Sequence, residues 1–443
     1  MKRVAFNTLG CKVNQNETEA IKALFKKAEY TVVPFKEEAD VYVINTCTVT
    51  HLGDRKSRQV IRKAIKNNPQ AKVLVTGCYA QTSPGEILEI SGVDLVIGTS
   101  ERHKIVELVE QIEKGTEPLN AVSDIMEARE FENLPLPENS RTRAFLKVQE
   151  GCNQYCTYCI VPYARGPLRS RMPNLVVEQV KELVDKGFYE IVLSGTHTGA
   201  YGKDLEGGYN LAKLIEEITK LQGLKRLRIS SVDPHDFTPE LTEILVSSDI
   251  VCPHFHIPLQ SGDDTILKRM KRPYNTDWFR NLIEKLKEKD SHVAFTTDVM
   301  VGFPGETPEQ FENTMRFIRE VGFADMHVFK YSPRKGTPAA EYPDQIQEPE
   351  KDSRSKALLQ VATELRNNFA TDFLNAKKEV LVERAWQKDE GNDYADSEMY
   401  WEGLTDNYIR VVFPKGEEPT GLVPVKLQKW QGQFMWGEPV SGR

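Results

Sequence analysis

The sequence predicts an α/β protein in three parts: a doubly wound parallel sheet, a partial (β/α)6 barrel and a small antiparallel β-barrel. Three observations predict this division. Strand and helix patterns alternate in two series, separated by a segment without a regular period. The C-terminal part changes to short β-branched and aromatic runs punctuated by Gly, Pro, Asp and Asn. The chain has 443 residues, which is long enough for several domains.

The first part, residues 1–115, is predicted to be the doubly wound domain. Its strands are expected at residues 3–8, 41–45, 72–76 and 93–97, and its helices at 16–28, 55–67 and 101–113. Ligand sites in such sheets lie outside the carboxyl ends of the strands. Residues that follow different strands should therefore meet at one edge of the sheet.

Residues 116–141 carry several prolines and acids without a sustained period, and we predict a linker there. The central part, residues 142–370, alternates strand and helix patterns again. Its strands are expected at residues 144–149, 190–195, 225–230, 254–259, 293–301 and 326–331, with helices between them, for example at 176–187 and 307–322. Six units are fewer than the eight of a closed barrel, so we expect an open barrel with its active site at the carboxyl face.

A long helix is expected at residues 348–376, and it leads into the third part, residues 371–443. Short strands are expected there at residues 380–385, 408–413, 421–430 and 433–440. Small β-barrels often bind oligonucleotides. This part holds more acids than bases, so composition leaves RNA binding open.

Bulk composition excludes some classes of protein. Hydrophobic residues make up 40% and charged residues 28% of the chain, as in globular proteins. No apolar run approaches the roughly 20 residues of a membrane span, and the N-terminus does not resemble a signal peptide. A cytoplasmic protein is expected, and thiols stay reduced there. Seven cysteines therefore favour metal binding or catalysis over disulfides.

Six of the cysteines form two groups of three. Cys152, Cys156 and Cys159 lie together in GCNQYCTYC, a spacing typical of an iron–sulfur site. The alternative is zinc, but zinc sites usually combine two knuckles with four ligands, and no fourth Cys or His follows nearby. Three thiolates would leave one iron of a cluster without a protein ligand, and that iron could bind a substrate.

The second group is dispersed along the chain. Cys11, Cys47 and Cys78 each follow an apolar run of the first part. A single buried cysteine is usually structural, but three at matching strand ends predict a second cluster. Cys252 has no thiol neighbour in sequence, and we predict a packing role for it.

Glycine-containing turns follow three strands of the predicted barrel. Glycine permits close backbone approach to a ligand, although ordinary loops also use it. Candidate cofactor contacts from these turns are Ser194, Gly195, Thr196, Gln260 and Gly302. His254 and His256 alternate on one strand, and we expect satisfied polar or substrate-contacting side chains rather than a metal site.

The net charge of −7 speaks weakly against nucleic acid, yet basic residues gather locally at residues 53–66, 164–171 and 268–272. A local basic face can bind phosphate on an acidic protein. Candidate RNA contacts are the helical stripe of Arg55, Arg58, Arg62 and Lys66, together with Arg165. The alternative for the stripe is a solvated helix face.

The segment GCNQYCTYCIVPYARG resembles the radical S-adenosylmethionine enzymes, whose signature CxxxCxφC has an aromatic residue at the position of Tyr158. With TLGCKVNQNETE, NTCTVT, VTGC, HIPLQSGDD and GFPGET, the chain resembles the methylthiotransferase branch over nearly its whole length. TLGCKVNQ is most similar to the threonylcarbamoyladenosine tRNA methylthiotransferases. The isopentenyladenosine-modifying relatives typically have YGCQMN at the first cysteine, and those that modify a ribosomal-protein aspartate have LGCPKN. This chain has Lys12, Val13 and Asn14 after Cys11 and so departs from both motifs.

This resemblance implies an auxiliary 4Fe-4S cluster on the dispersed cysteines, a radical SAM domain with a second 4Fe-4S cluster on the local ones, and a C-terminal TRAM domain that binds RNA. S-adenosylmethionine would bind the second cluster, with Tyr158 and the glycine turns nearby. The reaction implied is insertion of a methylthio group at C2 of N6-threonylcarbamoyladenosine next to the anticodon. The implied partners are the tRNA anticodon stem-loop and a low-potential electron donor. Isopentenyladenosine or a ribosomal-protein aspartate are the alternative substrates.

Overall fold

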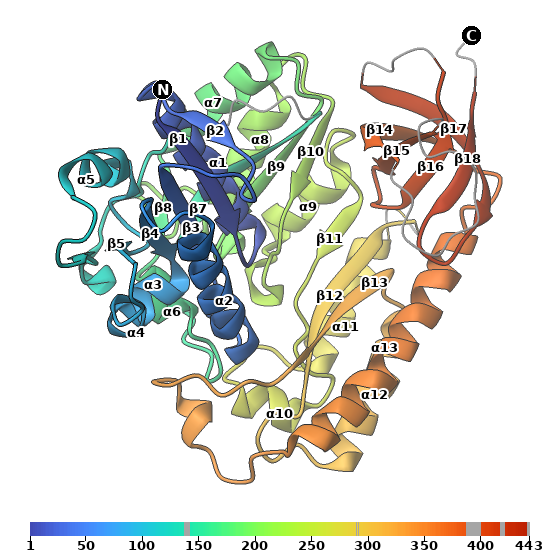
Figure 1. Ribbon diagram of the computed structural model, residues 1–443. Coiled ribbons are helices and arrows are strands. Elements are labelled where there is room, and N and C mark those ends of the chain that lie inside the picture. Colours follow the sequence, from blue (N-terminus) through green and yellow to red (C-terminus); the bar gives the residue numbers. More distant parts are fainter. Residues whose placement is uncertain (137–141, 289, 291, 387–399, 417–420, 441–443) are drawn as a thin grey trace.

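The computed structural model describes residues 1–136, 142–288, 290, 292–386, 400–416 and 421–440. It confirms the predicted α/β class and the three kinds of architecture. Figure 1 shows the N-terminal sheet and the C-terminal barrel on opposite sides of the central part. Among the described residues, no helix has an apolar stretch long enough to cross a bilayer.

The N-terminal sheet has six parallel strands in the order β2-β1-β3-β4-β5-β6. Their bounds are Arg3–Thr8 (β1), Thr31–Val33 (β2), Val41–Thr46 (β3), Lys72–Gly77 (β4), Leu95–Ile97 (β5) and Leu119–Ala121 (β6). Helices α1 (Lys12–Lys27) and α5 (Ile105–Gln111) cover one face, and α2 (His51–Asn67), α3 (Cys78–Thr82) and α4 (Pro84–Leu88) cover the other. Every residue of β3 is buried, because both faces of the sheet are covered.

Two strands of this sheet were not expected from the sequence. Strands β2 and β6 have three residues each, none of them buried, so neither gives the apolar run from which the equally short β5 was expected. Strand β6 lies inside the segment predicted as a linker, so the sheet extends beyond residue 115. Residues 137–141 of that segment lie outside the described residues.

Six parallel strands form the central barrel. They are β7 (Arg143–Glu150), β9 (Glu190–Gly195), β10 (Arg226–Ile229), β11 (His254–His256), β12 (Ala294–Val301) and β13 (Asp325–Lys330). Only the Leu227–Val251 bridge joins β10 to the segment before β11, and β8 (Arg169–Ser170) adds a short antiparallel edge to β7. The predicted open barrel is confirmed. Strand β11 ends earlier than expected, since Pro258 cannot donate a ladder hydrogen bond.

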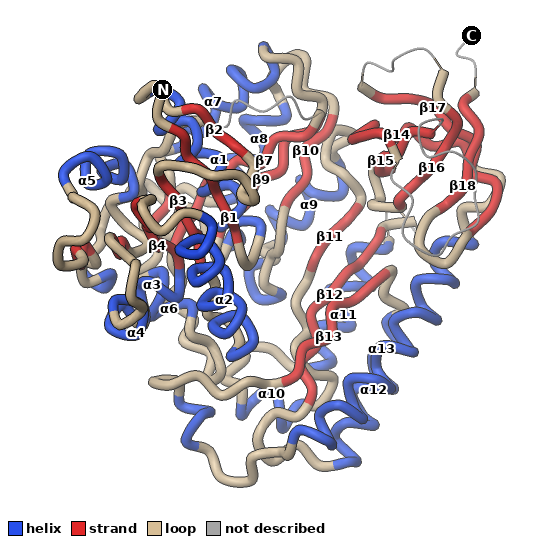
Figure 2. The backbone as a smooth tube through the Cα atoms, viewed as in Figure 1, coloured by secondary structure: helices blue, strands red, loops and turns tan. Residues whose placement is uncertain are grey.

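Eight helices accompany these strands: α6 (Val161–Arg165), α7 (Pro173–Asp185), α8 (Leu211–Thr219), α9 (Pro239–Ser247), α10 (Asp264–Arg269), α11 (Thr276–Lys287), α12 (Pro308–Val321) and α13 (Glu348–Thr371). Strands β11 to β13 run from the C-terminal barrel toward α10 in Figure 2. Because α10 follows β11 in the chain, the carboxyl ends of the strands face away from the C-terminal barrel.

The C-terminal part is a closed barrel in the order β14-β15-β16-β18-β17. Its strands are Lys377–Ala385 (β14), Tyr400–Thr405 (β15), Arg410–Pro414 (β16), Leu422–Trp430 (β17) and Met435–Pro439 (β18). Strand β15 was not predicted, because its sequence YWEGLT lacks a clear alternation and contains Gly403. A Cβ at Gly403 would lie 2.2 Å from the carbonyl oxygen of Leu381 on the neighbouring strand. The β16–β18 pair is parallel, and the other four pairs are antiparallel as expected.

Candidate functional site

The structure brings the three dispersed cysteine loops to one edge of the N-terminal sheet. Cys11 precedes α1, Cys47 follows β3, and Cys78 begins α3 directly after β4. Strands β1, β3 and β4 are neighbours and parallel, so their carboxyl ends lie together. Gly10 has a φ of +103°, and a Cβ there would lie 3.1 Å from the Cys47 Sγ. Glycine is therefore required for the Cys11 and Cys47 loops to approach each other.

Arg165, from the central part, reaches this dispersed cysteine site. Its Nε donates a hydrogen bond to the Cys78 Sγ at 3.2 Å, and its Nη2 donates to the Asn14 Oδ1 at 2.5 Å. Burial raises the pKa of the Cys78 thiol to about 12, and the Arg165 charge opposes that increase. The side chain of Arg165 is 3% exposed. It is therefore not at the surface where we expected it to contact RNA.

The three local cysteines lie on the loop that follows β7. The Cys152 amide donates to the Gly166 carbonyl, and the Cys159 amide donates to the Cys156 carbonyl, so the loop closes on itself. Gly151 starts the loop with a φ of +74°, and a Cβ there would lie 1.9 Å from the Pro167 carbonyl oxygen. No larger residue fits this position without moving the backbone.

Cys152 lies next to a histidine, which in turn contacts a carboxylate. The His197 Nδ1 lies 3.5 Å from the Cys152 Sγ, and its Nε2 lies 2.6 Å from the Asp236 Oδ2. Lys203 donates to the other oxygen of Asp236. Burial alone would lower the pKa of His197, but its contacts with Asp236 and Cys152 raise it to about 10. A protonated imidazole next to a thiolate would stabilise the thiolate's charge.

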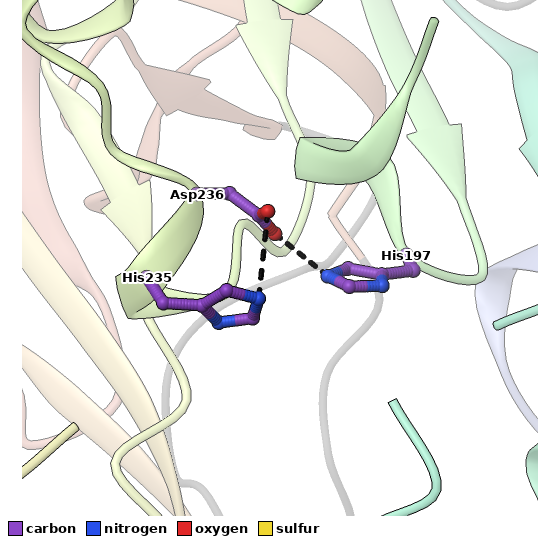
Figure 3. A group of neighbouring side chains, drawn as sticks. All are labelled: His197, His235 and Asp236. Atoms are coloured by element: carbon purple, nitrogen blue, oxygen red, sulfur yellow. Dashed lines mark hydrogen bonds and ion pairs between the residues drawn. The ribbon is translucent and has the colours of Figure 1, made fainter. Parts of the chain in front are cut away.

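Figure 3 shows that His197 and His235 both approach the carboxylate of Asp236. One ligand atom from each lies within 4.8 Å of the others, a spacing that a metal ion could use. Both ring nitrogens of His197 already face Asp236 and Cys152, however. The group therefore serves better to orient Cys152.

Arg272 plays the corresponding role at Cys156. Its Nη1 donates to the Cys156 Sγ at 3.1 Å, and its Nη2 pairs with Asp233. Burial raises the pKa of Cys156, and the Arg272 charge opposes the increase. Sequence reasoning had placed Arg272 in a basic run suited to phosphate and had not singled out His197. Their partners lie 39 to 116 residues away in sequence, so no local signal identified these roles.

The donor sets of the two sites fit iron–sulfur clusters. All six thiols are free. Five of them lie on loops, and the sixth, Cys78, is the first residue of α3. Each site also has an arginine next to one sulfur, which offsets the negative charge of a cluster bound by thiolates. Cys252 is buried beside Arg228 and belongs to neither group, in agreement with a packing role.

The six candidate cofactor contacts divide into three that stay candidates and three whose identity is explained by packing. Thr196 donates to Glu150 at 3.1 Å near the local cysteines, and Gln260 has a φ of +67° at the end of the segment after β11. Tyr158 packs against the cluster containing Ile266 and Met270. These three remain candidates for contact with a bound molecule.

The other three glycine-turn residues are explained by packing. The hydroxyl of Ser194 is buried and donates to the Leu146 carbonyl. A Cβ at Gly195 would lie 2.8 Å from the Gln149 Oε1, and one at Gly302 would lie 2.4 Å from the Lys351 side chain. Close packing therefore explains why both positions hold glycine.

The basic stripe predicted on α2 lies largely in solvent. Arg55, Arg62 and Lys66 are exposed. Arg58 is half-buried, donates to the Tyr79 hydroxyl at 2.7 Å and lies 3.7 Å from Glu86. Three of the four side chains are thus free to reach phosphate, and the RNA contact stays a prediction.

Comparison with known proteins adds independent findings. A family model described as Radical SAM superfamily matches residues 146–318, and one described as Uncharacterized protein family UPF0004 matches residues 3–98. The radical S-adenosylmethionine methyltransferase TsrM from Kitasatospora setae, solved with cobalamin and a [4Fe-4S] cluster, has a TM-score of 0.57 at 15% identity, covering 76% of this chain and 77% of that one. At that identity the likeness shows the fold alone.

Three relatives show how specific the match is. Threonylcarbamoyladenosine tRNA methylthiotransferase MtaB of Bacillus subtilis is 49% identical over 98% of this chain and 97% of its own. The MtaB of Aquifex aeolicus is 41% identical over 83% and 89%. The tRNA-2-methylthio-N(6)-dimethylallyladenosine synthase of Moorella thermoacetica is 37% identical over 98% of both chains.

Proposed function

The chain belongs to the methylthiotransferase family of radical S-adenosylmethionine enzymes, and from this premise we propose that it inserts a methylthio group at C2 of N6-threonylcarbamoyladenosine next to the anticodon of tRNA. One observation carries the proposal. The loop that holds Cys152, Cys156 and Cys159 leads directly into α6, whose last residue, Arg165, reaches Cys78. The two three-thiol sites are thus held in a fixed position relative to each other. A reaction that uses both sites requires this.

We assign the ligands of the auxiliary 4Fe-4S cluster to Cys11, Cys47 and Cys78, and those of the radical SAM cluster to Cys152, Cys156 and Cys159. When bound, the clusters and S-adenosylmethionine supply the radical and the methylated sulfur. The side chains around them supply position and charge. Arg165 and Arg272 each donate to one thiol, and His197, held by Asp236, orients a third.

The RNA must present a single base to the site. An adenosine in an anticodon loop can leave its stack at low cost, so a base turned out of the loop can enter the barrel. The exposed Arg55, Arg62 and Lys66 of α2 and the C-terminal barrel are our candidates for contact with the stem-loop. A low-potential electron donor and a cytoplasmic location complete the proposal.

The second candidate is isopentenyladenosine, the adenosine modified by the relative from Moorella thermoacetica according to its name. The chain is 49% identical to the Bacillus subtilis MtaB but 37% identical to the Moorella thermoacetica synthase, over the same share of the chain. The higher identity favours the threonylcarbamoyl substrate. Mass spectrometry of tRNA nucleosides from a strain lacking this gene tests the choice. We expect the 2-methylthio form of threonylcarbamoyladenosine to disappear and to return with a plasmid copy. Loss of the 2-methylthio isopentenyl nucleoside instead would establish the alternative.

A further inference from the structure

One aromatic side chain of the C-terminal barrel lies against the amino ends of two central barrel strands, β7 and β11. Tyr408 lies in the turn between β15 and β16, with a φ of +72°. Its ring stacks on His254 of β11, with ring centroids 4.5 Å apart and an angle of 12° between the planes. The C-terminal barrel therefore places an aromatic ring against the interior of the central barrel.

Cationic groups surround this ring. The guanidinium carbons of Arg228 and Arg143 lie 4.9 and 5.8 Å from its centroid. The Lys12 Nζ, which comes from the N-terminal part, lies 5.6 Å from the same centroid. All three parts of the chain thus contribute to one cluster, which we call the cationic floor: Lys12, Arg143, Arg228, His254 and Tyr408.

The cationic floor holds more positive charge than its carboxylates balance. Glu190, which is fully buried, pairs with Arg143 and Arg228, both at 2.8 Å, and lies 4.0 Å from Arg226. Glu383 adds one pair with Arg143 at 3.2 Å. Lys12 has no acidic partner in the described part of the chain. Its charge is therefore available to an anionic ligand.

Three polar atoms of the cationic floor are buried without a hydrogen-bond partner among the described residues. They are the Nδ1 of His254 and the Nε and Nη2 of Arg143, and both side chains are 7% exposed. The Arg143 Nε is nevertheless ion-paired with Glu190 at 2.8 Å. A buried polar group without a partner is costly unless a ligand or water satisfies it. Lys12 and Arg143 also line a cavity of about 240 Å³, with Phe145 and Phe188 among its walls.

Lys12 is the residue directly after Cys11. In adenine, C2 and C6 are both bonded to N1. If the base presents C2 to a sulfur held at the Cys11 site, its N6 substituent therefore begins only a few ångströms from that sulfur. A lysine side chain spans that distance. Within the proposed function, the N6 substituent is a threonylcarbamoyl group, which ends in a carboxylate.

We propose that Lys12 binds the carboxylate of the threonylcarbamoyl group and selects this substrate against adenosines with an uncharged N6 substituent. Arg143 and His254 offer their unpartnered nitrogens to the polar atoms of the same group. An apolar substituent would leave these groups desolvated and unpaired, and a site built for a polar partner rejects analogues that lack it. The inference rests on the proposed function, because it names how that substrate is recognised.

The experiment compares two anticodon stem-loop RNAs, one with threonylcarbamoyladenosine and one with its methyl ester. The ester keeps the shape of the substituent but removes its charge. We expect the reconstituted full-length protein to bind the acid on the order of tenfold or more tightly than the ester, as a charge-assisted hydrogen bond allows. Lys12→Gln should abolish this preference, and Lys12→Arg should keep most of it. Lys27→Gln removes the same charge from the exposed far end of α1 and should change nothing.

Binding and turnover together separate the two proposals. A Lys12→Gln protein that still prefers the acid as strongly as the unsubstituted protein overturns the role of Lys12. If the unsubstituted protein meanwhile methylthiolates the acid-bearing RNA, the proposed function stands. If the unsubstituted protein neither prefers the acid nor methylthiolates it, both proposals are overturned.

Discussion

At the scale of single residues, each cysteine site has its own arginine next to one sulfur. Arg165 donates to Cys78 and Arg272 to Cys156, each through one nitrogen. The other nitrogens of Arg165 are held by Glu17, Glu150 and Asn14, and those of Arg272 by Asp233 and Tyr274. Hydrogen bonds to cluster sulfurs stabilise the reduced, more negative state and so raise the reduction potential. The two sites should therefore be tuned independently.

We predict that Arg165→Lys and Arg272→Lys each lower the reduction potential of a different cluster. Lysine keeps the charge but cannot reach the sulfur and the carboxylates together. Losing about 1 kcal/mol of stabilisation of the reduced state corresponds to a lower potential by about 40 mV for one electron. Redox titration followed by electron paramagnetic resonance should show the Arg165 variant shifting only the auxiliary cluster and the Arg272 variant only the other. Equal shifts of both clusters in either variant would contradict the assignment.

Much of the site could be predicted from individual residues, and some of it could not. The positions of Cys11, Cys47 and Cys78 after neighbouring strands were enough to predict that they meet. Strand ends are set by local pattern, and parallel pairing then brings them together. The role of Arg165 was missed, because its partner Glu17 lies 148 residues earlier and its basic surroundings suggested a surface contact.

At the scale of elements, the loop after β7 depends on its first residue. Alanine at Gly151 would have to adopt a φ of +74° and would place its Cβ 1.9 Å from a backbone oxygen. We predict that Gly151→Ala displaces the loop and lowers the iron and sulfide bound per chain by about half, since one of two sites fails. Gly187→Ala is the control, because its φ is +87° and nothing lies within 4 Å of the added Cβ. That variant should lose only about 1 kcal/mol of stability and keep its full iron content.

Elements that lie in a clear apolar pattern were predicted well, and strands without such a pattern were not. The barrel strands and the long helix α13 follow from apolar patterns of four or more residues. Strands β2 and β6 have three residues, and β15 contains a glycine that only a close neighbouring strand explains. Their pairing partners, rather than their own sequences, determine these strands.

At the scale of the whole molecule, a buried ionic cluster joins the N-terminal sheet to the barrel. Glu17 and Arg102 come from the N-terminal part, and Lys147, Glu150 and Arg165 from the barrel. Glu17 lies 2.5 Å from Arg102, 2.9 Å from Lys147 and 2.5 Å from Arg165. The Cys78 and Cys152 sites are fixed relative to each other through this cluster, because Arg165 belongs to it.

Removing one carboxylate from this cluster should loosen the junction. Glu17→Gln leaves buried cations without a partner, and we expect it to lower the free energy of unfolding by about 3 kcal/mol or more at pH 7. Glu37→Gln breaks the exposed Arg3–Glu37 pair and should cost about 1 kcal/mol or less. Denaturant unfolding of the metal-free proteins measures both, and similar losses in the two variants would show that the cluster does not hold the parts together.

The same cluster predicts how stability depends on pH. Burial alone would raise the pKa of Glu150, but the charges of Lys147 and Arg165 outweigh the effect of burial and lower this pKa to about 2. The pKa of Glu17 is likewise well below its usual range. A carboxyl group with a lowered pKa stabilises the fold above its ordinary pKa near 4.5, and this contribution is lost as the pH falls toward 2. The metal-free protein should therefore lose stability steeply below about pH 4.5. Glu17→Gln, which lacks one of these groups, should show a shallower loss, so that the two unfolding curves converge in acid.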